Sequence, residues 1–484
     1  MGIDGDTPLD YSDTIYPDSG YNCVEPLPFL LILVKPRQDE CFGFTMPSAL
    51  SDLQQLRTVL GRLDAERPAS SDTSDDRMPY VERTDGFQAR LQLELSSRKG
   101  KARLLVSGQI GVGKSSELRR FAFEHRNADS FYIFCDLEQE MQPEHCGAAA
   151  VLLAIFRDCW SAALSYGGDS QPERNAICNS TIEMLVDWLK GEYRDDRRRV
   201  VFRFHGMEYS VHLNGRAKGT GLLLILGKAA LHQAVSQSSE RFGLIPDPLL
   251  NQLNRLLEWI RNKSQRQPVI LVDHVDKIRD STAAREVLVD AHPQWQRIAA
   301  SFVMTAPFEY TLGDLRHSVE SRWNAPLLVY PLQFSGRDEG PIPQIYWKMA
   351  LATGLRGLIA EESLRLLAYY SGGIARYFIQ FLRSACLEAH LAKHDVIDPT
   401  DCSIVVNNAL RNYQDYSQRQ LELLAEIEDY GSGLGEAAEL LRSPISLLVQ
   451  RSAGDQQQII VHPLARPALE RYRLKKAARE KVGQ

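Results

Sequence analysis

The chain has 484 residues and a formal net charge of −6, from 56 Lys and Arg against 62 Asp and Glu. This length is enough for about two or three domains. Apolar residues make up 44% and charged residues 24%, which is ordinary for a globular protein. The acidic balance excludes a generally basic nucleic-acid-binding chain, so any such contact must come from a local basic patch.

The cysteines and apolar runs restrict the cellular setting. Eight cysteines are scattered along the chain, and none forms C-x-x-C or a zinc-ligand spacing with histidine. We therefore expect reduced thiols that pack as small hydrophobic side chains in a reducing compartment. The apolar run at residues 26–34 is too short to span a bilayer and follows an acidic leader unlike a signal peptide. The sequence thus predicts a cytoplasmic protein with no membrane partner.

The first part of the chain reads as an extension that precedes the main fold. Residues 29–34 predict a buried strand, and residues 48–66 predict an amphipathic helix. The apolar face of that helix would consist of Leu50, Leu53, Leu56, Val59 and Leu60. Residues 67–79 are a Ser/Asp/Pro linker, so we expect residues 1–79 to form an N-terminal extension and linker.

Residues 80–330 alternate between predicted strands and helices. The strand patterns are "ARLLVSG", "SFYIFCDLE", "QPVILVDHVDKI" and "RIAASFVMTAP". Strands joined by helices in this way predict an α/β fold with a doubly wound, largely parallel sheet. An insertion at about residues 165–262 separates the second and third strands and holds "DDRRRVVFRFHGMEYSVHLNG", which alternates like a short β-hairpin.

The rest of the chain predicts two smaller domains. Residues 331–402 repeat apolar side chains every three or four positions, which indicates a helical domain. Residues 403–484 end with two short apolar runs around a Gly-Asp turn and then a helix, the outline of a winged-helix domain with a basic tail.

One loop carries the strongest chemical signal. Residues 108–115 fit G-x-x-x-x-G-K-[ST], with a predicted strand before them and a predicted helix after them. Glycines let successive backbone N–H groups curve around phosphate oxygens, and the helix directs its positive end at the same anion. The loop predicts an ATP site in which Lys114 reaches the β- and γ-phosphates and Ser115 is a ligand of Mg²⁺. The predicted nucleotide-binding residues here are Gly108, Gln109, Ile110, Gly111, Val112, Gly113, Lys114, Ser115 and Ser116.

Polar residues at the ends of other strands would complete this site. A phosphate loop needs a carboxylate at the end of a neighbouring strand to hold the magnesium shell, and Asp273 follows four apolar residues. Asp276 could polarise the attacking water or cap the next turn, and Glu138 is another candidate base. Thr305 could bind the γ-phosphate or attacking water, or be satisfied by backbone groups.

This order of parts resembles an AAA+ or STAND-type P-loop ATPase. Residues 80–121 are similar to the start of initiator-type AAA+ and STAND modules, which implies that Arg83 lies against the adenine. "VILVDHVDKI" resembles the Walker B segment of STAND and KAP-type ATPases. Many AAA+ ATPases have a catalytic glutamate directly after the aspartate, where this chain has His274. The resemblance therefore implies slow hydrolysis, which suits a switch better than a motor.

The resemblance also assigns arginines. "LAYYSGGIARYFIQFLRSA" looks like the sensor 2 segment of origin-recognition-type lids, with Gly372, Gly373 and Arg376 in the G-G-x-x-R places. Arg376 would then reach the nucleotide from the lid, or it is simply an exposed arginine at a helix start. Related ATPases carry an arginine finger for the neighbouring subunit after the fourth strand, where we favour Arg322 and then Arg316.

Three functions remain open from the sequence. The first is an ATP-dependent switch that forms homo-oligomers and controls a partner effector protein; by resemblance, antiphage defence is a plausible setting. The second is a DNA-binding, initiator-type AAA+ ATPase that loads or remodels a complex on DNA. The third is a scaffold that binds nucleotide without turning it over. The C-terminal tail has seven basic and two acidic side chains, which could contact phosphates or keep a terminus soluble.

Overall fold

The structure is a computed structural model, and the chain divides into two units, residues 1–46 and 47–484. Only the second unit contains residues whose structure is described. The predicted strand at 29–34, the linker at 67–79 and Arg83 lie outside the described residues. Those described are residues 50, 53–64, 80–82, 86–98, 100–125, 129–139, 146–164, 172–189, 192–196, 199–204, 207–212, 247–330, 341–413, 416–430, 440, 447–453 and 456–482.

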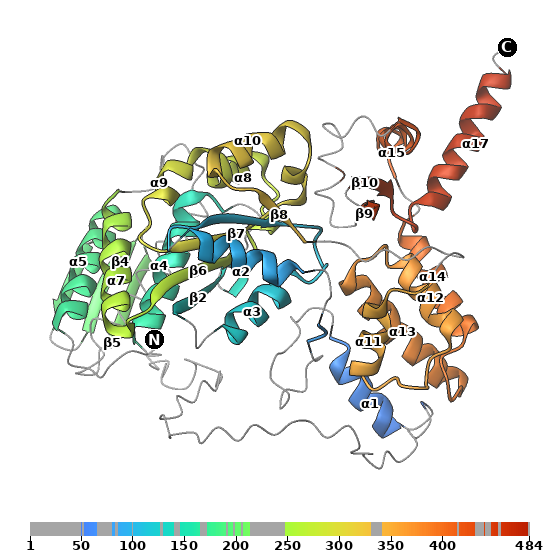
Figure 1. Cartoon of the computed structure of the whole chain (residues 1–484), viewed down its shortest axis with the longest axis horizontal. Helices are drawn as coiled ribbons and strands as arrows, with labels where there is room; N and C mark the ends of the chain where they lie inside the picture. The colour runs from blue at the N-terminus through green and yellow to red at the C-terminus, as the bar shows by residue number, and fades with distance from the viewer. Residues whose placement is uncertain are drawn as a thin grey trace, which may run out of the picture. The chain divides into compact units, whose positions relative to one another are not determined.

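A five-stranded parallel sheet forms the centre of the α/β part of the chain. Figure 1 shows its strands lying among the surrounding helices. Its strands, in their order across the sheet, are β2 (Ser130–Asp136), β6 (Gln267–Asp273), β7 (Ser301–Ala306), β1 (Arg103–Ser107) and β8 (Leu327–Val329). The predicted α/β class and parallel sheet are confirmed. Two features were not predicted: the short edge strand β8, and the position of β7 between β1 and β6.

Helices cover both faces of this sheet because side chains alternate along each buried strand. On β1, Leu104 and Val106 pack on one face, in a cluster with α2 (Phe87–Ser97) and α3 (Lys114–Glu124). Leu105 points to the other face and packs in a second cluster. The helices of that cluster are α4 (Ala148–Leu164), α5 (Pro172–Leu189), α7 (Asp247–Ser264) and α10 (Gly313–Trp323).

The segment between β2 and β6 contributes both a small sheet and part of the main core. Its antiparallel strands are β3 (Glu192–Asp196), β4 (Arg199–Phe204) and β5 (Met207–His212). The pair β4–β5 is the predicted hairpin, and β3 extends it by one strand. Helix α7, which lies almost wholly inside the predicted insertion, buries an apolar face against α4 and α5 in the main core.

Short elements connect β6 to β8. They are η4 (Val275–Lys277), α8 (Ser281–Arg285), η5 (Glu286–Asp290), α9 (His292–Gln296) and η6 (Phe308–Thr311). A further turn, η2 (Leu137–Gln139), follows β2 directly.

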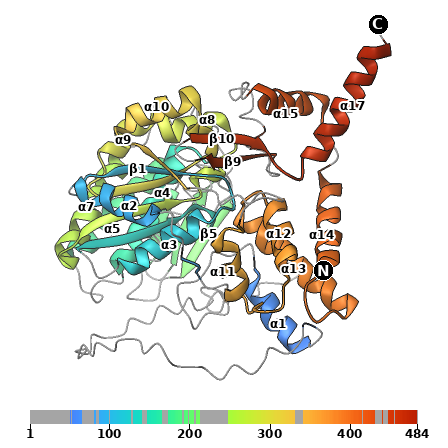
Figure 2. The same cartoon turned by 45° about the vertical axis from the view of Figure 1, so that its right-hand side comes forward.

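Four helices form a bundle over residues 341–413, which we call the lid. The predicted boundary between residues 402 and 403 falls inside the last of these helices, which packs on the two before it. They are α11 (Gln344–Ala352), α12 (Glu361–Tyr370), α13 (Ala375–Ala392) and α14 (Pro399–Asn412). Figures 1 and 2 show α1 (Leu53–Arg62) beside this bundle, and Leu56 and Val59 are buried in the lid's hydrophobic cluster. Arg383 Nη1 donates to Leu60 O at 2.7 Å. Leu53, predicted to face the core, is 51% exposed at the start of α1.

The C-terminal module, residues 416–482, follows the lid. It contains α15 (Gln418–Tyr430), the antiparallel pair β9 (Leu448–Ala453) and β10 (Gln456–Val461), and α17 (Arg466–Val482). The strand pair and following helix agree with the sequence pattern, and the winged-helix assignment itself stays a prediction. In the part of the chain that the structure describes, no helix has both the length and the hydropathy needed to cross a membrane.

His462 joins the C-terminal module to the lid. Its ring is fully buried, stacks on Tyr413 with 5.6 Å between centroids, and meets Tyr377 edge-on at 5.8 Å. A Cβ placed on Gly372 would lie 2.5 Å from His462 Nε2, so only glycine leaves room for this ring. Burial lowers the pKa of His462 to about 3. The junction therefore requires a neutral imidazole.

We predict that His462 makes the fold less stable in mild acid. In the unfolded chain the imidazole has its ordinary pKa of 6.5. Below that pH the unfolded state therefore binds a proton at His462, whereas the folded state keeps the ring neutral. Stability should be complete above pH 7 and fall by about 2 kcal/mol between pH 7 and pH 5. Urea titrations of wild type and His462→Gln at both pH values test this, and an equal pH dependence in the two proteins would contradict it.

Candidate nucleotide-binding site

The loop at residues 108–115 connects β1 to α3 at the carboxyl edge of the sheet. Gly113 has a left-handed backbone (φ 109°) and caps α3, which begins at Lys114. Gly111 is also left-handed (φ 85°), and a Cβ there would lie 2.9 Å from Arg376 Cβ. The loop is therefore shaped both by its turn and by the lid that touches it.

Lys114 lies across this loop with its side chain only 4% exposed. Its Nζ donates to Gly108 O at 2.7 Å and to Gln109 O at 3.0 Å, and it pairs with Asp276 Oδ2 at 2.8 Å. Burial alone would raise the pKa of Asp276, but the charge of Lys114 holds that pKa below its usual value. Asp276 is therefore the buried counter-ion of Lys114.

Asp273 ends β6 and is completely buried. Its Oδ1 accepts from the backbone N–H of His274 at 2.9 Å, while Oδ2 has no hydrogen-bond partner among the described residues. Burial raises the pKa of Asp273 and the nearby charge of Asp276 adds to the rise, which His274 and Ser115 oppose. An orphaned carboxylate oxygen beside the Ser115 hydroxyl is an oxygen donor set that fits Mg²⁺.

His274 lies at the same edge of the sheet. Its Nδ1 lies 2.7 Å from Asp136 Oδ1, and Arg119 binds the other oxygen of Asp136 at 2.7 Å. Burial alone would lower the pKa of His274, but the hydrogen bond to Asp136 and the charge of Asp273 raise it above 6.5. The register of β2 and β6 pairs Asp136 with Asp273, so parallel pairing brings these groups together.

Glu138 and Thr305 have different surroundings from each other. Glu138 is half exposed and forms an ion pair with Lys277. Thr305 is fully buried, and its hydroxyl accepts from the N–H groups of Val275 at 3.0 Å and Asp276 at 3.4 Å. Its observed contacts therefore satisfy the backbone of the turn after Asp273, which was one of the two predicted alternatives.

Two parts of the chain reach the loop from beyond the sheet. The backbone N–H of Arg376, at the start of α13, donates to Gly111 O at 2.9 Å. Gln109 Nε2 donates to Leu448 O at the start of β9. The structure thus brings Arg376 to the loop, together with a contact to the C-terminal module that the sequence did not predict.

Other predicted residues are placed as follows. Val112 is buried, Ile110 is partly exposed, and Ser116 lies in the first turn of α3. Arg322 is exposed in the last turn of α10, and Arg316 pairs with Glu320 at 3.1 Å. No described contact joins either arginine to the loop.

The sequence missed several groups near the site. Glu117 is 3% exposed in α3 and accepts hydrogen bonds from the hydroxyls of Tyr80 and Tyr330, each at 2.9 Å. No sequence pattern distinguishes this glutamate from a solvent-facing one. Asp136 could have been predicted from the sequence, because it is the last residue of its strand, as Asp273 is.

A second group of candidate ligands lies in the lid. His394 Nδ1 is 3.0 Å from Asp401 Oδ1 and 3.6 Å from Asp398 Oδ2. Both carboxylates belong to the capping box of α14, where they accept from each other's backbone N–H groups. Helix capping therefore accounts for this cluster.

We predict that Thr305→Val destabilises the protein by about 2 kcal/mol, because two buried N–H groups lose their acceptor. Thr353→Val is the matched control: this threonine is equally buried, but its hydroxyl donates to Ala350 O within its own helix. Thermal unfolding of both variants gives the comparison. Equal losses would contradict an acceptor role for Thr305.

Neither a protein-family model nor a curated protein matches the chain. Solved structures do match, and the three described here are at low identity. The Aeropyrum pernix ORC1 protein in complex with DNA has 13% identity and a TM-score of 0.37, covering 81% of this chain and 92% of that one. Cdc6p from Pyrobaculum aerophilum has 11% identity and a TM-score of 0.38, covering 85% and 98%. A Walker-type ATPase of Pyrococcus abyssi has 16% identity and a TM-score of 0.41, covering 87% and 99%.

These three structures are 16% identical or less with TM-scores below 0.5, so the resemblance to initiator-type P-loop ATPases stays a prediction from the sequence. Their TM-scores carry no argument about what this chain binds. Function therefore has to be argued from the geometry of the site.

Proposed function

We propose that this chain binds ATP with Mg²⁺ at the loop 108–115 and hydrolyses it slowly. The observation that carries the proposal is the buried Lys114–Asp276 pair beside the unsatisfied Oδ2 of Asp273. Buried charged groups are costly unless partners satisfy them. A triphosphate offers oxygens to Lys114, and its accompanying cation offers a positive charge to Asp273. Bound Mg²⁺ would neutralise phosphate charge during transfer.

Slow hydrolysis follows from how the candidate bases are held. His274 stands directly after Asp273, Asp276 is paired with Lys114, and Glu138 is paired with Lys277. When Lys114 turns to the phosphates, Asp276 loses its partner and becomes free to orient the attacking water. Hydrolysis thus depends on a prior rearrangement of a buried ion pair, which supports a switch rather than a motor.

The contacts around the loop supply the output of such a switch. Gly111 O accepts a hydrogen bond from Arg376 N in the lid. The Gln109 side chain donates a hydrogen bond to Leu448 O in the C-terminal module. Phosphates that reshape the loop would change both contacts. We propose that nucleotide state thereby sets how the lid and C-terminal module engage the core. Homo-oligomers in which Arg322 is an arginine finger for the neighbouring subunit fit this proposal. An effector partner and a role in antiphage defence rest on the sequence alone.

Removing the Lys114 ammonium should weaken this binding. We expect Lys114→Met to weaken the affinity for a fluorescent ATP analogue by at least about tenfold, the cost of one lost charge-assisted contact. Lys101→Met, an exposed lysine before β1, is the control. Lys114→Met combined with Asp276→Asn removes both charges of the buried pair, so a loss of binding in that variant does not arise from an Asp276 carboxylate left without its lysine.

Wild-type affinity in the double variant would refute the site. The wild type could instead bind ATP and release phosphate no faster than Lys114→Met does. That result would favour the scaffold that does not turn nucleotide over.

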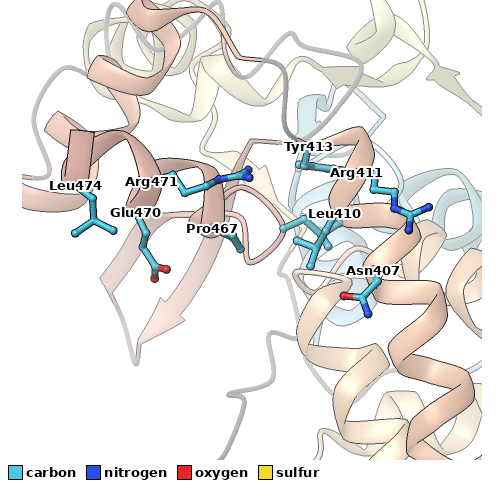
Figure 3. A pocket seen from close by; sticks show the side chains of 9 residues that line it. Asn407, Leu410, Arg411, Tyr413, Pro467, Glu470, Arg471 and Leu474 are labelled. Atoms are coloured by element: carbon cyan, nitrogen blue, oxygen red, sulfur yellow. The ribbon is translucent and has the colours of Figure 1, made fainter. Parts of the chain in front are cut away.

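A specific observation favours DNA as a second ligand. Arg471, Lys475 and Arg479 are exposed at intervals of four residues on α17, so they lie on one face about 6 Å apart along the helix. None has an ion pair among the described residues, whereas Arg473 is bound to Glu428 at 2.9 Å. A pocket of about 540 Å³ lies between α14 and α17, and Arg411 and Arg471 are among its lining residues. Figure 3 shows these side chains. We call Arg471, Lys475 and Arg479 the α17 row.

We predict that the α17 row contacts DNA phosphates. Changing all three to Gln should reduce the slope of log affinity against log salt by about 2.7, because each phosphate contact contributes about 0.9. Fluorescence anisotropy with a short duplex measures this, and the same triple change at Arg255, Arg261 and Lys263 on α7 is the charge-matched control. An unchanged slope in the α17 variant would exclude this interface.

A further inference from the structure

His274 adopts a backbone that few residues tolerate. Its φ is 69°, in the left-handed region, although the residue is buried and directly follows Asp273. Histidine is one of the residues that enters this region at modest cost, and such outliers persist where the surroundings hold them in place. The left-handed turn sends the imidazole back across the edge of the sheet toward α3 and Ser115.

The short hydrogen bond of the ring is on its Nδ1 side. Nδ1 is hydrogen-bonded to Asp136 Oδ1 at 2.7 Å, and Arg119 fixes Asp136 through its other oxygen. A carboxylate accepts, so Nδ1 donates the hydrogen. This carboxylate–histidine arrangement is the one that typically orients a metal-binding imidazole, because it directs Nε2 outward.

Nε2 faces three oxygen atoms that are too far away for good hydrogen bonds. Ser115 Oγ and Glu138 Oε2 are each 3.5 Å from it, and Asp273 Oδ2 is 3.7 Å from it. Ligands that share a cation with bonds of about 2.1 Å lie about 3.0–3.5 Å apart. Ser115 Oγ and Glu138 Oε2 fall within this range, and Asp273 Oδ2 lies just beyond it. Asp273 Oδ2 is also the buried oxygen without a hydrogen-bond partner. The spacing of the donors and the unsatisfied carboxylate oxygen together point to a cation beside Nε2.

We propose that His274 Nε2 is a ligand of the divalent cation that accompanies the nucleotide, beside Asp273 and Ser115. This rests on the nucleotide site proposed above. Mg²⁺ takes oxygen ligands almost exclusively, whereas imidazole suits first-row transition metals. The imidazole therefore adds affinity for a transition metal, while the oxygens of Asp273 and Ser115 still suit Mg²⁺. Asp136 is a positioning residue for the ring, and Arg119 positions Asp136.

Mn²⁺ is the probe, because its electron spin reports a coordinated nitrogen directly. With Mn²⁺ and a non-hydrolysable ATP analogue, the wild type should show ¹⁴N modulation in electron spin-echo spectra. His274→Asn should remove that modulation and weaken Mn²⁺ affinity by about tenfold, a typical loss for a disturbed metal site. Mg²⁺ affinity should change much less. Asparagine also tolerates a left-handed backbone, so the variant keeps the turn.

His394→Asn is the matched control, since it removes the histidine of the His394–Asp398–Asp401 cluster and should leave the ¹⁴N signal intact. Mn²⁺ bound with the analogue but without ¹⁴N modulation, or with modulation that survives His274→Asn, overturns the inference. In either of those outcomes the nucleotide site still stands. An analogue that does not bind the wild type at all instead refutes the proposed function.

Discussion

The buried ion pair between Lys114 and Asp276 is the interaction on which the rest of the site depends. The two side chains are 4% and 6% exposed, and their charged atoms are 2.8 Å apart. Such a pair adds little net stability, because desolvation offsets most of the attraction, but breaking it without replacement is costly. A ligand that offers new oxygens to Lys114 can exchange partners within the same pocket. The pair therefore keeps the loop ordered while leaving its lysine available to an anion.

Parallel strand pairing explains why so many polar groups meet at this edge. In a parallel sheet all strands end on the same side, so the residues after each strand share one surface. β2 ends in Asp136, β6 ends in Asp273, and β1 leads into the loop. β7, which lies between β1 and β6, carries Thr305, whose hydroxyl accepts hydrogen bonds from the backbone N–H groups of the turn after Asp273. Charge at this edge is therefore concentrated by topology rather than by sequence proximity.

The glycine positions link this edge to the lid and the C-terminal module. The start of α13 lies in close contact with Gly111, and the His462 ring lies in close contact with Gly372. Each glycine lacks a Cβ at a point where another segment approaches closely, so a side chain at either position would force two parts of the fold apart. The nucleotide loop, the lid and the C-terminal module are consequently joined by short contacts that small local shifts would alter.

The sequence by itself determined the α/β class, the loop at 108–115 with its lysine, and the carboxylate at Asp273, because these follow from local patterns of apolar spacing and glycine. It also placed the strand pair and helix near the C-terminus, and it left two roles open for Thr305 and Asp276. Only the tertiary structure decided that Asp276 pairs with Lys114 and that Asp136 orients His274, because these partners lie 162 and 138 positions apart in the chain. It likewise decided that Glu117 is buried and that Gln109 reaches Leu448, since strand order and long-range packing leave no periodic trace in the sequence.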